Sequence, residues 1–228
     1  IKSEGTKLVL KDPMTWKFGL IYAFWQLQMN SNKAFMVAAI VASGLGDAKF
    51  GGMLMGGFSF AMMFGMPIIS FLGDYFPRKY VFGGGVLIAG AMFLGTWMVF
   101  GTGDPSLLPA MFAVLGFCSG TVGISWVMMS ECFTPDVRGF GPGVVSTFGI
   151  VGRVGGPLLA AWWINALFGG NTAAYTLFAA LIMFCAGILI FVWLPKTSGK
   201  LIGHYGDPLA DKYYAEHPEL KVAAKEEK

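Results

Sequence analysis

Two basic side chains lie deep inside long apolar stretches of this sequence. Lys33 ends the segment "QLQMNSNK", and Arg153 lies in "GIVGRVGGP". Gln26, Asn30 and Lys33 are spaced i, i+4 and i+7, so a helix would present all three on one face. A guanidinium binds a carboxylate or phosphate through two parallel hydrogen bonds, and an ammonium binds as a point charge. If these four residues line one cavity, they predict a binding site for a small anion.

The residues around Arg153 suit such a site. Gly152, Gly155 and Gly156 would let a ligand or another backbone approach the guanidinium closely. An aromatic ligand could also stack on tryptophans, although these more often pack or anchor a protein at the membrane interface. The tryptophans concerned are Trp25, Trp126, Trp162 and Trp163.

A structural interpretation of the two cations stays open beside the binding one. Arg153 could pair with an acid on a helix outside this chain, and Lys33 could extend to the interface or bind carbonyl groups. No Asp or Glu lies in the interior of the apolar segments, so neither cation has an acidic partner there. The sequence therefore predicts either an anion site or two cations with structural roles. In the second case Arg153 pairs with an acid outside this chain, and Lys33 reaches the interface or carbonyl groups.

The composition places these residues in a membrane protein. Of the 228 residues, 55% are hydrophobic and only 13% are charged, about half the charged share of an average soluble domain. The net charge of +3 is too small and too scattered to indicate nucleic-acid binding.

Motifs for catalysis and for cofactors are missing from the sequence. Both histidines, His204 and His217, lie in the polar C-terminal tail, and the three cysteines have no metal-ligand spacing. The sequence also contains no phosphate-binding G-x-x-x-x-G-K-[ST] loop. We therefore expect neither an enzyme nor a cofactor.

Long apolar runs predict an all-α membrane protein. A transmembrane helix needs about 20 apolar residues, and six segments meet that length: 16–44, 51–73, 80–102, 107–130, 140–168 and 172–194. The first is polar in its middle, so we expect it to be tilted, bent or locally unwound. The chain then divides into an N-terminal segment 1–15, a six-helix bundle 16–194 and a tail 195–228.

The flanking basic residues predict the orientation. If the N-terminus is cytoplasmic, the opposite face carries only Lys49 as a basic residue. By the positive-inside rule both termini are then cytoplasmic, in a multi-pass protein of the plasma or cytoplasmic membrane. The basic residues on the cytoplasmic side are Lys2, Lys7, Lys11, Lys17, Arg78, Lys79, Arg138, Lys196 and Lys200.

Several short motifs resemble the major facilitator superfamily. "DYFPRK" (74–79) looks like the D-x-x-G-R-[RK] loop of that family, with Pro77 in the Gly position. Glu131 and Arg138 match a glutamate and an arginine, with six residues between them, that follow the tenth helix of its sugar porters and organic-ion transporters. "PKTSGK" (195–200) is similar to the P-E-T-K-G sequence after the twelfth helix, with Lys196 where Glu is usual.

The fifth apolar segment adds to this resemblance. "VRGFGPGVVSTFGIVGRVGGP" is similar to the eleventh helix of the organic-ion, aromatic-acid and carboxylate branches. The motifs cover about residues 16–200 and correspond to the last six of the family's twelve helices. The resemblance therefore implies a half major-facilitator bundle.

The resemblance also implies a role for the charged loops. In the family such charges hold the cytoplasmic side closed while the transporter faces outward. The residues at these positions are Asp74, Arg78, Lys79, Glu131 and Arg138. The alternative interpretation is that they only anchor the helices at the interface and set the topology.

Two functions remain open at this point. The resemblance implies the C-terminal half of a secondary active transporter of the symporter kind. It would carry a small organic anion and work by alternating access with a second six-helix half. Any acid that couples transport to protons would then lie in that second half.

The alternative is a transporter-derived accessory subunit, bound to other membrane subunits. A homodimer fits less well, because it would gather four buried cations in one site. The expected partners are thus the lipid bilayer, a second six-helix half or other membrane subunits, and an anionic substrate, but no nucleic acid.

Overall fold

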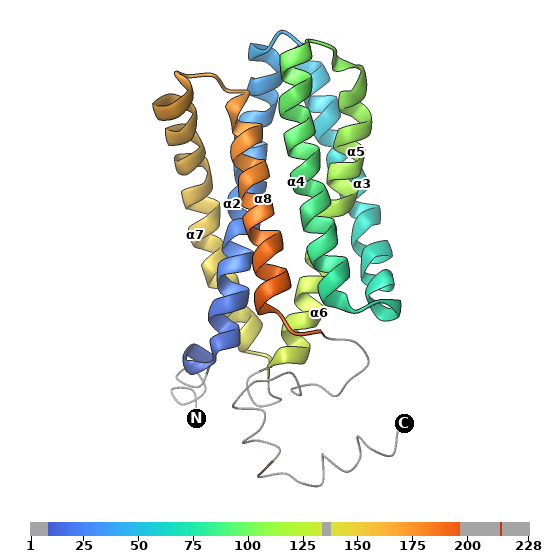
Figure 1. The fold of residues 1–228 in the computed structure, drawn as a ribbon, viewed down its shortest axis with the longest axis vertical. Coiled ribbons are helices and arrows are strands. Elements are labelled where there is room, and N and C mark those ends of the chain that lie inside the picture. Colours follow the sequence, from blue (N-terminus) through green and yellow to red (C-terminus); the bar gives the residue numbers. More distant parts are fainter. Residues whose placement is uncertain (1–8, 134–137, 197–214, 216–228) are drawn as a thin grey trace.

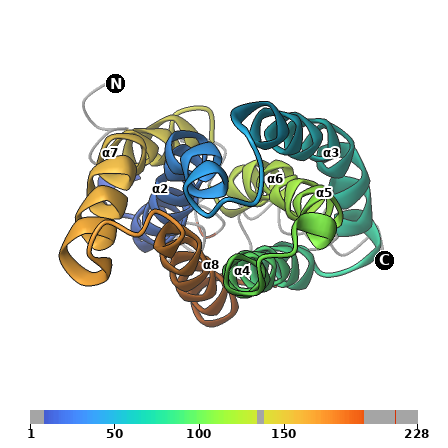
Figure 2. The same ribbon diagram turned by 90° about the horizontal axis from the view of Figure 1, so that it is seen from above.

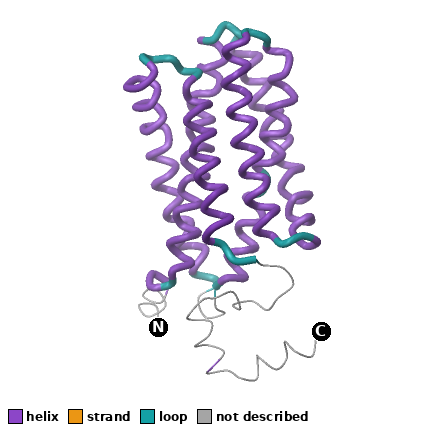
Figure 3. The backbone as a smooth tube through the Cα atoms, viewed as in Figure 1, coloured by secondary structure: helices purple, strands orange, loops and turns teal. Residues whose placement is uncertain are grey.

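The computed structural model describes residues 9–133, 138–196 and 215, and the regular structure of these residues is entirely helical. Long helices run side by side, and the loops gather at the two ends of the bundle (Figures 1 and 3). The elements in chain order are α2 (Pro13–Ala42), α3 (Ala48–Tyr75), α4 (Arg78–Thr102), η1 (Pro105–Leu107), α5 (Leu108–Ser119), α6 (Val122–Cys132), α7 (Gly141–Trp162), η2 (Trp163–Leu167) and α8 (Ala174–Trp193).

Five helical segments are long and apolar enough to cross a membrane, and they confirm five of the six predicted spans. Their bounds are Ala48–Tyr75, Arg78–Thr102, Pro105–Cys132, Gly141–Phe168 and Ala174–Trp193. The sixth predicted span is α2, which has 30 residues. Its polar middle keeps it outside this group, so the count of six spans stays a prediction.

Helix α2 is continuous through its polar middle, which corrects the expectation of a local unwinding. Asp12 caps its start by accepting a hydrogen bond of 2.7 Å from the backbone N–H of Met14. The helix ends before Ser43, and Gly44 follows with a φ of 69°. Since every backbone group inside a helix is satisfied internally, polar side chains alone do not break it.

The fourth and fifth spans are less regular than their sequence suggests. The fourth is divided into α5 and α6 at Gly120 and Thr121, where the backbone of Gly120 packs directly on Gly65 of α3. The fifth begins as α7, contains Pro157, and ends in the π-helical turn η2. Proline inside a helix and a wider last turn both release backbone hydrogen bonds locally.

Glycines join α2 to α7 and α3 to α5 at very short distance. A side chain at Gly152 would collide with the carbonyl of Ala23, and one at Gly156 with the carbonyl of Leu27. Gly116 and Gly65 make the same kind of approach between α5 and α3. Such contacts let backbones pack closely where no hydrophobic force drives helices together. Gly155 faces open space instead.

The helices form two sides of a bundle. Viewed from above, α4 and α8 lie along one side, and α7, α2 and α3 lie along the other (Figure 2). The spans containing α3 and α7 are the least buried of the five. Only 22% and 28% of their apolar 18-residue windows are buried inside the bundle. Large apolar side chains therefore remain exposed there, among them Phe60 and Met63 of α3 and Val151 and Leu158 of α7.

The start of α2 and the end of α8 lie at the same end of the bundle, together with the α3–α4 connection (Figure 1). The predicted segments 1–15 and 195–228 lie largely outside the described residues, so their placement stays a prediction.

Candidate functional site

A polar cleft of about 440 Å³ opens between α2, α3 and α7. All four residues that the sequence singled out for anion binding line it: Gln26, Asn30 and Lys33 from α2, and Arg153 from α7. The helical spacing on α2 thus places its three residues as predicted, and Arg153 meets them from the neighbouring helix. Their role in binding stays a prediction.

Gln26 is the centre of the hydrogen bonds in this cleft. Its Nε2 donates to the hydroxyl of Tyr22 at 2.7 Å. Its Oε1 accepts from Asn30 Nδ2 at 3.1 Å and from Arg153 Nε at 3.2 Å. Asn30 Nδ2 also lies 2.9 Å from the backbone carbonyl of Gln26. Gln26 is only 5% exposed, so its bond to Tyr22 is buried, whereas its bonds to Asn30 and Arg153 are partly buried.

The charge in the cleft is not neutralised by the described part of the chain. Arg153 and Lys33 are exposed, and neither forms an ion pair with a described residue. The described lining includes no carboxylate. Of the three guanidinium nitrogens of Arg153, only Nε has a described hydrogen-bond partner. The cleft is therefore positively charged, with donors available for an acceptor that the described residues do not supply.

Apolar side chains also line the cleft. Trp25 and Met29 come from α2, and Phe58 and Met62 come from α3. An anion with an apolar body would thus meet both charged and hydrophobic groups in the same cleft.

Of the four predicted tryptophans, only Trp25 lines this cleft. Trp126 packs edge-on against Tyr22, with 5.4 Å between ring centroids. Trp163 donates a hydrogen bond of 3.1 Å to the carbonyl of Ala174, and Trp162 is exposed. These three are therefore packing or surface residues in this structure.

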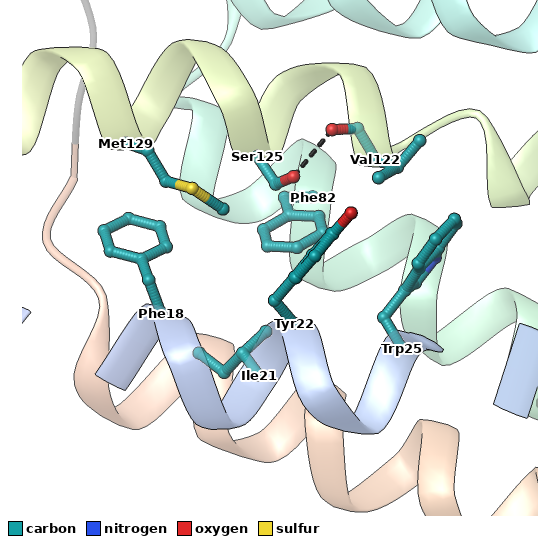
Figure 4. A pocket seen from close by; sticks show the side chains of 8 residues that line it. All are labelled: Phe18, Ile21, Tyr22, Trp25, Phe82, Val122, Ser125 and Met129. Atoms are coloured by element: carbon teal, nitrogen blue, oxygen red, sulfur yellow. Dashed lines mark hydrogen bonds between the residues drawn. The ribbon is translucent and has the colours of Figure 1, made fainter. Parts of the chain in front are cut away.

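Beside the cleft, Tyr22 and Trp25 belong to an apolar core between α2, α4 and α6 (Figure 4). The space left in this core is about 10 Å³, which is no more than one water molecule occupies. Ser125, the polar member of the lining on α6, satisfies its hydroxyl by donating to the carbonyl of Val122 at 2.6 Å. The core offers no room for a ligand, so the polar cleft is the better candidate site.

Two further amides of α2 lie off the cleft. Gln28 and Asn32 are almost fully buried, at 1% and 0% exposure. Gln28 Nε2 and both polar side-chain atoms of Asn32 have no hydrogen-bond partner within the described residues. The backbone carbonyl of Gln28 accepts a hydrogen bond of 3.2 Å from the hydroxyl of Tyr175 on α8. These amides face the interior of the bundle rather than a ligand.

Three of the five predicted gating residues meet at the end of the bundle where α2 begins. Arg78 Nη1 donates to Glu131 Oε1, and Arg78 Nη2 donates to Asp74 Oδ1 at 3.0 Å. The side chains of Arg78 and Glu131 are only 13% and 14% exposed, whereas that of Asp74 is 61% exposed. Arg78 therefore links the end of α3, the start of α4 and the end of α6.

The other two predicted gating residues do not join this cluster. Lys79 and Arg138 form no ion pair with the described residues. Arg138 Nε is buried without a hydrogen-bond partner in the part of the chain that the structure describes. Among the described residues, Arg78 rather than Arg138 is therefore the cation that pairs with Glu131.

Lys196, which stands where Glu is usual in the family, contacts an aromatic ring. Lys196 Nζ lies 5.3 Å from the centre of the Tyr80 ring. Hydrogen bonding to Tyr80, together with the field of that side chain, raises the pKa of Lys196. A cation over an aromatic face is attracted to it, so this contact joins the end of α8 to the start of α4.

Comparison with protein families agrees with a helical membrane bundle. The family described as the Major Facilitator Superfamily matches residues 18–216, which is most of the chain. The chain belongs to this superfamily. It is therefore an integral, multi-pass membrane protein of the major facilitator type, a family of membrane transporters. No curated protein matches the chain significantly.

In this superfamily member, the cleft and its immediate support include residues that the sequence did not single out. Tyr22 holds Gln26, and its position four residues before Gln26 continues the polar stripe of α2, so helical spacing was a usable signal. Phe58, Ser59 and Met62 complete the lining from α3. They lie in a Met- and Gly-rich run with no distinguishing pattern, and only the packing of α3 reveals them.

Proposed function

We propose that this chain is the C-terminal half of a secondary active transporter that carries a small organic anion. Membership of the major facilitator superfamily supports the transporter class. The observation that carries the anion is the cleft itself, which Lys33 and Arg153 both line without an acid among the described residues.

The electrostatics of the cleft favour a carboxylate. A cation at mid-membrane depth is costly unless something compensates its charge. Arg153 has two terminal nitrogens available, and a carboxylate can accept from both at once. Lys33 lies seven residues from Gln26 on α2, which separates the two along the helix axis by about 10 Å. Lys33 thus adds attraction at the far end of the cleft, while Trp25 and Phe58 suit an apolar body.

The exposed faces of α3 and α7 favour a second six-helix half. These helices flank the cleft, and their spans are the least buried of the five. A second bundle on this side would close the cleft and supply the opposite wall of a central site, as in transporters built from repeats. Rocking of the two halves around that site gives alternating access.

The distribution of basic residues supports cytoplasmic termini. Lys11, Lys17, Arg78 and Arg138 belong to the end of the bundle where α2 begins, whereas Lys49 lies at the opposite end, in the first turn of α3. The positive-inside rule then assigns the first end to the cytoplasm. On this assignment the cluster of Asp74, Arg78 and Glu131 is cytoplasmic, and we assign it the role of holding that side closed.

A ligand panel tests the proposed function on the natively purified assembly. Acetate, benzoate and succinate are compared with acetamide, benzamide and succinamide, with binding measured by isothermal titration and by ligand-induced shifts in thermal unfolding. We expect at least one carboxylate to bind and its neutral amide not to bind.

Matched variants assign that binding to the cleft. Arg153→Met should abolish carboxylate binding, whereas Lys49→Met removes an exposed cation far from the cleft and should leave binding intact. The proposal is wrong if no carboxylate of the panel binds, or if Arg153→Met binds as well as the parent. Purification of an assembly that contains no second six-helix half and does not transport would favour the accessory-subunit alternative.

A further inference from the structure

We infer that Gln26 acts as a positioning residue for Arg153 and is not itself a ligand of the anion. This inference rests on the proposed function, since it assigns a role within the same cleft. It revises the prediction from the sequence, which grouped Gln26 with Lys33 and Arg153 as a direct binding residue. The reason lies in how completely the protein already uses the Gln26 amide.

The orientation of this amide is fixed by its neighbours. A guanidinium has donors only, so the atom that faces Arg153 Nε at 3.2 Å must be the acceptor Oε1. Asn30 Nδ2 donates to the same oxygen at 3.1 Å. The nitrogen of Gln26 must then point the other way, where the hydroxyl of Tyr22 accepts from it at 2.7 Å. Burial at 5% exposure leaves little of Gln26 within reach of a ligand.

Engagement of Nε decides which edge of the guanidinium is available. A carboxylate can bind arginine side-on, through Nε and one terminal nitrogen, or end-on, through both terminal nitrogens. Gln26 occupies the side-on edge of Arg153. The end-on fork therefore remains for the ligand, and Arg153 is otherwise exposed in a cleft that no described acid shares.

The support of Gln26 extends beyond the cleft through Tyr22. The Tyr22 ring is stacked with Trp25, with 6.1 Å between centroids and 9° between planes, and Trp126 packs against it edge-on. On another side Tyr22 lies against Gly149 of α7, where a larger residue would collide with its ring. Tyr22 is thus held by packing and in turn holds Gln26. A binding group held by a rigid supporting shell binds more tightly because less freedom is lost on binding.

The proposed role makes three distinguishable expectations for anion binding. Gln26→Met keeps the length and the apolar stem but removes both polar atoms. Loss of a hydrogen bond to a charged group commonly weakens an interaction by about tenfold or more. We therefore expect the Kd of the bound carboxylate to rise by about tenfold. Gln28→Met is the matched control, because Gln28 is an equally buried glutamine of α2 away from the cleft, and its Kd should equal that of the parent.

Tyr22→Phe separates positioning from direct binding. This change removes only the oxygen that accepts from Gln26 Nε2. If Gln26 positions Arg153, loosening it should weaken the binding of the carboxylate. If Gln26 binds the anion directly, freeing its N–H should leave binding unchanged or make it tighter.

A double-mutant cycle tests whether Gln26 acts through Arg153. Arg153→Lys keeps the charge but has no planar fork to align. Gln26→Met should therefore have little further effect in the Arg153→Lys background, whereas a general structural role would weaken binding equally in both backgrounds. The measurement is isothermal titration of the natively purified assembly with benzoate, or with acetate or succinate if one of these binds more tightly.

The outcomes separate this inference from the proposed function. If no carboxylate binds the parent, or if Arg153→Met leaves binding intact, the proposed function and the inference both fail. If Arg153→Met abolishes binding but Gln26→Met matches the parent, the inference alone fails. The inference also fails alone if Tyr22→Phe does not weaken binding, or if the effect of Gln26→Met is the same in both backgrounds.

Discussion

Removal of Arg78 should release the end of α6 from the start of α4. Arg78 is the only described cation that pairs with Glu131, through Oε1, and Glu131 Oε2 is buried with no hydrogen-bond partner in the described part of the chain. Arg78→Met keeps most of the apolar stem but leaves the Glu131 carboxylate without its counter-charge. We expect the end of α6 to separate from the bundle far more often in this variant.

The size of the effect follows from the burial of the pair. Breaking a fully buried ion pair on one side costs about 3–5 kcal/mol. The side chains of Arg78 and Glu131 are 13% and 14% exposed, so we expect about 2–3 kcal/mol, or a 30- to 140-fold larger open population. Asp74 is 61% exposed, and surface pairs contribute about 0–1 kcal/mol. Asp74→Asn should therefore open the end of α6 about fivefold at most.

A native cysteine reports this opening. Cys132 follows Glu131 at the end of α6 and is 1% exposed. In a Cys118→Ala, Cys185→Ala background, the rate at which a soluble maleimide labels Cys132 measures the open population, provided closing is fast. The order expected is Arg78→Met, then Glu131→Gln, then Asp74→Asn, then the parent. Equal labelling rates in Arg78→Met and Asp74→Asn would refute the conclusion that the Arg78–Glu131 pair holds the end of α6 in place.

Two further predictions concern packing. Gly152→Ala should lower the free energy of unfolding by about 1–3 kcal/mol, because the new methyl group meets the carbonyl of Ala23. Gly155→Ala is the control and should be neutral or slightly stabilising, because its site is open. Thermal unfolding monitored by tryptophan fluorescence compares the two variants. Asn32→Leu should raise the unfolding temperature, because it replaces a buried amide that has no described partner with an apolar group of similar size, relieving about 1–3 kcal/mol. Asn30→Leu removes hydrogen bonds to Gln26 instead, and an equal gain in that variant would contradict this reasoning.

The sequence predicted those features that depend on one helix at a time. Five of the six apolar runs became helices that can span a membrane, because length and composition decide this. The i, i+4, i+7 spacing placed Gln26, Asn30 and Lys33 on one face of α2 for the same reason. That this face shares one cavity with Arg153 was one of the two interpretations left open, since charges within a membrane usually face a bundle interior or a water-filled cavity.

Features that depend on how neighbouring helices pack against each other could not be predicted from the sequence. No pattern in the sequence says that Phe58 and Met62 face the cleft rather than lipid, or that Arg78 rather than Arg138 binds Glu131. The fourth span is likewise divided at Gly120, where its backbone lies against Gly65 of α3. The sequence shows the glycine but not the neighbouring helix that it meets.

The glycine contacts of the two helix pairs determine where a chemical cross-link would matter. Gly152 and Gly156 seat α7 on the main chain of α2, and Gly65 and Gly116 do the same for α3 and α5. Paired cysteines placed within either helix pair would tether helices that are already in backbone contact, so transport should continue. Paired cysteines that join α7 to α3 would place the link across the cleft that these helices line, so they should block the anion and stop transport.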